Sequence, residues 1–85
     1  METKWLVELR PAFGGYAKES SPRYYAGYYR DGQPVSTEDP WKAALFCDRY
    51  SATCTAVTLR AGAGCLWLAT EHWFIPETHR TQRIN

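Results

Sequence analysis

The amino-acid sequence predicts an α+β fold: an antiparallel β-sheet of about five strands in the order β-β-β-α-β-β, with one main helix packed on one face. Three observations support this prediction. Alternating or aromatic-rich segments are typical of strands and occur at both ends of the chain. Between them, one segment near residue 40 combines a helix start with an apolar stripe. Asp31-Gly32 and the Ala/Gly run at 61–64 are turn sequences of the kind that join paired strands.

Chain length and composition indicate one folded domain. The 85 residues are 45% hydrophobic and 15% aromatic, with four Trp, six Tyr and three Phe. Each ring can bury on the order of 150–250 Å² of surface, so a short chain can fill a core with them. We expect a single domain over residues 1–76, followed by a polar, flexible C-terminal tail over 77–85.

The first strand is predicted over residues 4–10, where apolar and charged residues alternate. The apolar side contains Trp5, Val7 and Leu9, and the charged side contains Lys4, Glu8 and Arg10. Leu6 is the one exception to this alternation. Pro11 ends the strand because proline cannot continue the hydrogen-bond ladder, and the Gly- and Ser-containing stretch 12–21 is expected to be a loop.

The second strand is predicted over residues 23–30, Arg-Tyr-Tyr-Ala-Gly-Tyr-Tyr-Arg. A period of two places Tyr24 and Tyr28 on one face, and Tyr25 and Tyr29 on the other face with Gly27 between them. One short helix can cover only one face, so we expect one tyrosine pair to face outward and take this to be Tyr25 and Tyr29. The reverse register would expose the other pair. Asp31-Gly32 then turns the chain into a short edge strand over 33–36.

The main helix is predicted over about 40–51. Asp39 can cap its first amides, and Pro40 suits the first helical position. The apolar stripe that follows consists of Ala43, Phe46, Cys47 and Tyr50.

A hairpin of residues 54–60 with 65–75 is predicted to complete the sheet. Three Thr and one Val between 53 and 60 argue against a helix there, because β-branched side chains lose rotamer freedom in helices. The alternative is that residues 52–60 are helical. Pro76 ends the last strand.

Residues that could carry catalysis or bind metal do not form a known pattern. Cys47, Cys54 and Cys65 are odd in number and lack a Cys-x-x-Cys spacing, which indicates a reduced, cytoplasmic protein in which they are small apolar fillers. His72 and His79 have no recognisable nucleophile context. We therefore expect no enzyme activity, metal or cofactor. No apolar run is long enough to span a membrane, so no membrane contact is expected.

The net charge of +1 argues against direct nucleic-acid binding, because dedicated nucleic-acid binders usually have a strong basic excess; a local basic patch is the alternative. The remaining candidate for function is the aromatic and basic second strand. Tyrosine and arginine are enriched at protein–protein hot spots. The residues expected to bind a partner are Arg23, Tyr25, Tyr29 and Arg30.

Four segments resemble small phage-encoded anti-CRISPR proteins of the type I class. They are Trp5-Leu-Val-Glu-Leu9, Trp41-Lys-Ala-Ala-Leu-Phe46, Thr55-Ala-Val-Thr-Leu-Arg60 and Leu66-Trp-Leu-Ala69. The resemblance implies a stoichiometric inhibitor without cofactor, which binds a host Cas effector complex and blocks its DNA binding or nuclease recruitment. No binding motif of the family aligns, so no binding residue is transferred. The alternative is an accessory interaction module of a phage or plasmid, forming a homodimer through a sheet edge or the tyrosine face.

Overall fold

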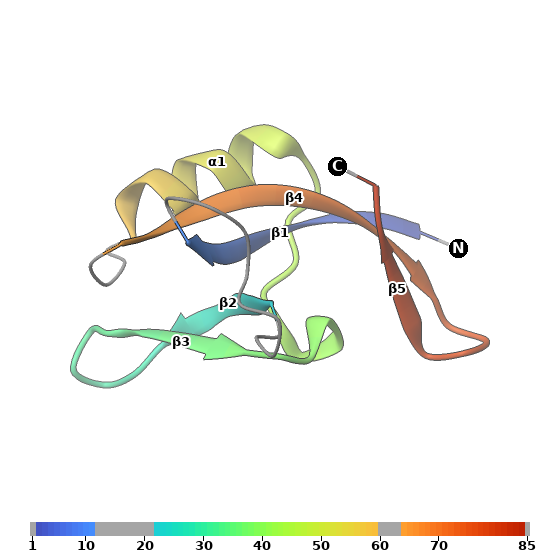
Figure 1. The fold of residues 1–85 in the computed structure, drawn as a ribbon, viewed down its shortest axis with the longest axis horizontal. Helices are drawn as coiled ribbons and strands as arrows, with labels where there is room; N and C mark the ends of the chain where they lie inside the picture. Colours follow the sequence, from blue (N-terminus) through green and yellow to red (C-terminus); the bar gives the residue numbers. More distant parts are fainter. Residues whose placement is uncertain (1, 12–21, 60–63, 85) are drawn as a thin grey trace.

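A computed structural model describes residues 2–11, 22–59 and 64–84. Its five strands form one antiparallel sheet in the spatial order β3-β2-β1-β4-β5, and one α-helix lies on the sheet, which confirms the predicted α+β fold and element order. The strands and helices are β1 (Glu2–Pro11), β2 (Arg23–Tyr28), β3 (Pro34–Thr37), a 3₁₀ helix (Pro40–Lys42), α1 (Arg49–Thr58), β4 (Cys65–Ile75) and β5 (Arg80–Arg83). Figure 1 shows α1 lying along β4, with β2 and β3 beyond β1.

The long pair of β1 and β4 is the centre of the molecule. Their register runs from Glu2 opposite Phe74 to Pro11 opposite Cys65. Leu6 and Val7 are neighbours in β1, so their side chains point to opposite faces of the sheet, and both are completely buried. The sheet is therefore covered on both faces, which is why Leu6 departs from the alternation of its strand.

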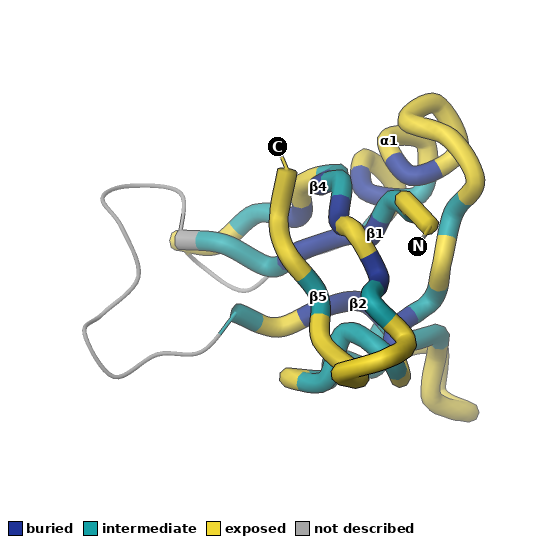
Figure 2. Tube along the Cα trace, turned by 90° about the vertical axis from the view of Figure 1, so that its right-hand side faces the viewer, coloured by how far each residue is buried: buried dark blue, intermediate teal, exposed yellow. Residues whose placement is uncertain are grey.

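Each face of the sheet has its own core. The core beneath α1 contains Val7, Tyr25, Ala52, Ala56 and Trp67. The core on the opposite face contains Leu6, Tyr24, Ala43 and Phe74, with Trp41 packed against it. In Figure 2 the buried part of β1, in dark blue, lies between α1 and β2. The second core needs no second α-helix, because the 3₁₀ helix and the residues after it cover it.

The helix was predicted about nine residues too early, and the prediction of residues 54–60 as a strand was wrong. Asp39 does cap Trp41, but the chain becomes extended at Ala43, and Phe46 exchanges two backbone hydrogen bonds of 2.9 Å with Trp5. The α-helix begins only at Arg49, after Asp48 accepts a 2.7 Å hydrogen bond from the amide of Ser51.

Packing explains why the β-branched segment is helical. Ala52 and Ala56 are four residues apart on the inner side of α1, and both are buried against the sheet. Helix propensity differs by less than about 1 kcal/mol per ordinary residue, so burial of this face outweighs it. The alternative that residues 52–60 are helical is thus correct as far as Thr58. Residues 60–63, which include most of the predicted turn at 61–64, lie outside the described residues. The predicted loop 12–21 also lies outside them.

The fifth strand comes from the segment interpreted as a tail. Residues 76–79 form a turn that begins at Pro76. β5 then pairs with β4, from Ile75 opposite Arg80 to His72 opposite Arg83. A strand at the sheet edge can be largely polar because one side faces water, and this made β5 difficult to recognise. In the ranges that the structure describes, no helix has the length and apolar character needed to cross a membrane.

Candidate functional site

A β-bulge at Gly27 sets the orientation of the tyrosines in β2. Tyr25 lies opposite Ser36, but Tyr28 lies opposite Pro34, so β2 has one extra residue between them. Gly27 has a φ of 115°, a conformation that side-chain-bearing residues rarely adopt. The bulge breaks the period of two that the sequence suggested.

The expected outward pair, Tyr25 and Tyr29, is therefore not a pair on one face. Tyr24 and Tyr25 are 7% and 8% exposed, and each is buried in the core of its own sheet face. Tyr28 and Tyr29 are 56% and 60% exposed. The prediction that Tyr25 faces solvent was wrong, because both sheet faces are covered and the bulge turns the end of β2 outward.

Tyr28 is exposed, but its ring packs against the buried ring of Tyr25. Its ring meets Tyr25 edge-on with a centroid distance of 5.6 Å, and Tyr25 meets Trp67 edge-on at 6.3 Å. Burial and a hydrogen bond with Tyr28 raise the pKa of Tyr25. An exposed ring supported by two others loses little conformational freedom when a partner binds it.

A cavity of about 210 Å³ lies beside Tyr28, between the β2–β3 turn and the end of α1. Its lining residues are Tyr28, Gly32, Gln33, Pro34, Thr58 and Leu59. The turn is ordered by hydrogen bonds from the amide of Tyr29 to the carbonyl of Gln33 (2.8 Å) and from the amide of Gln33 to Asp31 (3.0 Å). We call Tyr28, Tyr29, Arg30 and this cavity the tyrosine surface.

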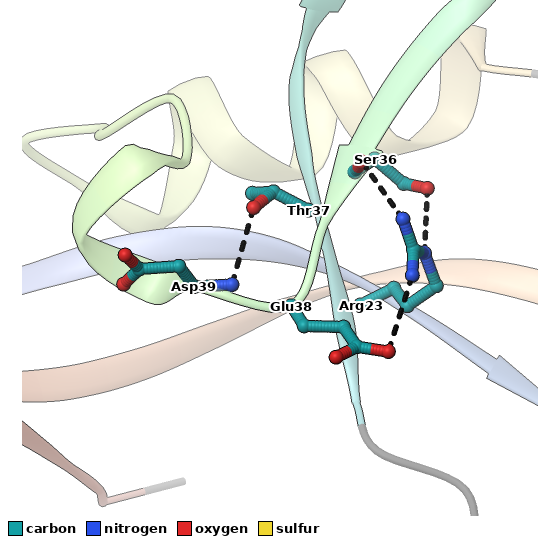
Figure 3. A network of polar contacts seen from close by, with 5 residues as sticks. All are labelled: Arg23, Ser36, Thr37, Glu38 and Asp39. Carbon is teal, nitrogen blue, oxygen red and sulfur yellow. Dashed lines mark hydrogen bonds and ion pairs between the residues drawn. The ribbon is translucent and has the colours of Figure 1, made fainter.

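Arg23 is the first residue of β2, and Arg30 lies just after the other end of the strand. The structure therefore does not bring the two arginines together. Figure 3 shows that Arg23 is bound to the end of β3. Its guanidinium donates to the hydroxyl of Ser36 at 2.8 Å, to the carbonyl of Ser36 at 3.0 Å and to Glu38 at 3.3 Å. The same figure shows Asp39 donating its amide to the hydroxyl of Thr37 at 3.1 Å. Arg23 thus holds the hairpin together, while Arg30 is exposed next to Tyr29.

A buried polar cluster on the face opposite α1 was not anticipated. Glu8, assigned to the solvent side from the sequence, is only 1% exposed, and it forms ion pairs with Arg10 and Arg83 at 2.5 and 3.7 Å. Thr70 and His72, each 2% exposed, lie within hydrogen-bond distance at 2.9 Å between Oγ1 and Nε2. The signal that could have revealed the cluster is Leu6, whose place in β1 indicates that this face is also covered.

His72 lacks the access that catalysis requires. The ring of His72 meets Tyr24 edge-on at 5.5 Å, and burial lowers the pKa of His72 although Glu8 opposes this effect. Its Nδ1 atom is buried without a hydrogen-bond partner in the described part of the chain. A histidine enclosed in this way cannot touch a substrate, so we assign the cluster to packing.

The cysteines are not the buried fillers that the sequence suggested. Cys47, Cys54 and Cys65 are all exposed and form no disulfide. Among the described residues, no three side chains of His, Cys, Asp or Glu are grouped as metal ligands.

Comparisons of this chain with protein-family models, curated proteins and solved structures find no match. The arrangement of its own surfaces is therefore the basis for a functional assignment.

Proposed function

We propose that this protein is a non-enzymatic inhibitor that binds a protein partner through the tyrosine surface. The observation that carries the proposal is the pair of exposed rings at Tyr28 and Tyr29, one of them supported by the buried Tyr25. Tyrosine provides a large contact area and a hydroxyl group at a low cost in side-chain entropy. The adjacent cavity of about 210 Å³ has room for a side chain of the partner.

The partner we propose is a Cas effector complex in the cytoplasm of a host cell. This rests on the resemblance to type I anti-CRISPR proteins, which implies a block of DNA binding or nuclease recruitment. The near balance of ten basic and nine acidic residues also favours a protein partner over nucleic acid. Tyr28, Tyr29 and Arg30 make the contact, whereas Tyr25 supports Tyr28 and Arg23 holds the β2–β3 hairpin in position.

Calorimetric titration of purified type I Cas effector complexes tests the proposal. We expect stoichiometric binding by the wild-type protein, and Tyr29→Ala should weaken it by about 2 kcal/mol, the loss typical of a hot-spot residue. The matched control is Tyr50→Ala, since Tyr50 is 79% exposed but lies on α1, outside the tyrosine surface.

Equal binding by the wild type and Tyr29→Ala would place the interface elsewhere. If no type I complex binds, and the wild type forms a dimer that Tyr29→Ala dissociates, the protein is instead a self-associating accessory module.

A further inference from the structure

A cavity of about 230 Å³ lies on the face of the sheet opposite α1. Its lining residues are Glu2, Lys4, Trp41, Leu45, Phe74 and Pro76, and none of them belongs to the tyrosine surface. They come from the start of β1, the end of β4 and the chain around the 3₁₀ helix. Figure 1 shows the β4–β5 turn on this side of the sheet, away from α1. Leu45 is 48% exposed, so the cavity is open to solvent.

Aromatic rings form an ordered wall of this cavity. The amide of Trp41 donates a 2.9 Å hydrogen bond to Asp39, which fixes the backbone at this residue. The indole ring meets Phe74 edge-on with a centroid distance of 4.9 Å and stacks on the ring of His79 at 4.4 Å. Because these rings are already held by their neighbours, a ligand that contacts them has little further ordering to impose on the wall.

Two side chains of opposite charge flank these rings. Glu2 lies opposite Phe74 and Lys4 lies opposite His72, so both side chains point to the face that holds the cavity. Neither of them forms an ion pair or a side-chain hydrogen bond in the part of the chain that the structure describes. Two residues along a strand span about 7 Å, so one carboxylate and one ammonium group stand side by side at the cavity.

This arrangement favours a ligand that combines a ring with two opposite charges. An apolar cavity of about 150 Å³ suffices for a benzene ring, so the cavity of about 230 Å³ has room for an aromatic side chain. A ligand with a single charge is attracted by one of the two flanking groups and repelled by the other, whereas a zwitterion pairs with both.

We propose that the cavity binds a free aromatic amino acid. The ring of the ligand lies against Trp41 and Phe74, its ammonium group pairs with Glu2, and its carboxylate pairs with Lys4. An aromatic residue within a peptide lacks both charged groups and fits the site less well. The site is separate from the tyrosine surface, and its test does not depend on the proposed function.

An NMR titration of the free protein with L-phenylalanine tests this inference through the indole N–H signal of Trp41, which is identified by its loss in Trp41→Phe. We expect this signal to shift with a Kd on the order of 1 mM, as fits a ligand of this size. L-Phenylalanine should bind at least about three-fold more tightly than phenethylamine, which lacks the carboxylate, and than hydrocinnamate, which lacks the ammonium group. L-Alanine, which has both charges but no ring, should cause no shift.

Lys4→Gln should abolish the preference for phenylalanine over phenethylamine and keep the preference over hydrocinnamate, because only the carboxylate of the ligand loses its partner. Glu2→Gln should have the converse effect. The matched control is Thr3→Lys, since Thr3 lies between these two residues but opposite Trp73, on the other face of the sheet. It should change neither preference, and the indole signal of Trp73 should stay unshifted throughout.

Equal affinity for phenylalanine and the two singly charged ligands would show apolar adsorption alone and would overturn the proposal. Unchanged preferences in Lys4→Gln and Glu2→Gln would also overturn it, as would a Trp41 signal that phenylalanine does not shift. If dilution of the protein shifts the signal and phenylalanine does not, a second copy of the chain occupies the cavity and the proposal is rejected.

Discussion

Glu8 and His72 are enclosed on the same sheet face as Leu6, although both side chains can carry a charge. Glu8 is stabilised by two arginines, whereas His72 has Thr70 at one ring nitrogen and meets the ring of Tyr24 edge-on. A buried histidine without a strong acceptor is more stable in its neutral form. The contribution of His72 to the stability of the folded protein should therefore depend on pH.

The free energy of unfolding should fall as the pH drops below about 6.5, the ordinary pKa of histidine. Burial lowers the pKa of His72 in the folded protein, so the unfolded chain takes up a proton first and gains stability relative to the folded state. The stability that His72 contributes is present above pH 6.5 and is lost as the pH falls toward its folded pKa. Urea unfolding between pH 5 and 8 measures this dependence.

His72→Gln should flatten the dependence on pH, whatever it does to the stability at neutral pH. His79→Gln is the control, because His79 is exposed. If the free energy of unfolding of His72→Gln depends on pH as steeply as that of the wild type, His72 is not the cause of the dependence. A flattened dependence in His79→Gln would also refute the role of His72.

At the scale of the elements, the order of strands and helix was predictable, but the residues that form the helix and the last strand were not. Turn residues and the Trp5, Val7, Leu9 alternation correctly located the early strands. The helix was misplaced because Asp39 and Asp48 are both capping residues, and only the pairing of Phe46 with Trp5 decides between them. That pairing is a tertiary contact over forty residues of sequence, which local patterns do not reveal.

The bulge in β2 is the element that produces the tyrosine surface, and Gly27→Ala tests it. No heavy atom lies within 4 Å of a side chain added there, so the cost is the strain of a φ of 115°, on the order of 1–3 kcal/mol. We expect urea unfolding to show this loss, and calorimetry to show weaker partner binding because Tyr28 and Tyr29 shift.

D-Alanine at position 27, introduced by chemical synthesis, is the matched control, since its mirror-image geometry suits a positive φ. Its stability should be close to that of the wild type. Equal stability of the L-alanine and glycine proteins would contradict the role given to the bulge.

At the scale of the whole molecule, the two covered sheet faces explain both the successes and the errors of the sequence interpretation. The sequence predicts one helix, which can cover only one face of the sheet. On that assumption, either Tyr24 or Tyr25 should face solvent, because the two neighbours point to opposite faces. The 3₁₀ helix and Trp41 cover the second face instead, so Tyr24 and Tyr25 are both buried. The exposed tyrosines of this segment are Tyr28 and Tyr29. Of the predicted site, Tyr29 and Arg30 remain on an open surface, whereas Tyr25 and Arg23 support it.

Hydrogen–deuterium exchange of the protein, alone and bound to a type I Cas effector complex, tests most directly that the tyrosine surface binds a protein partner. We predict that fragments covering residues 28–34 exchange more slowly in the complex, because the partner shields the β2–β3 turn and its cavity. Fragments from the start of α1, which include Tyr50, should exchange at the same rate in both states. Slower exchange confined to segments other than 28–34, or no change with any type I complex, would contradict the account.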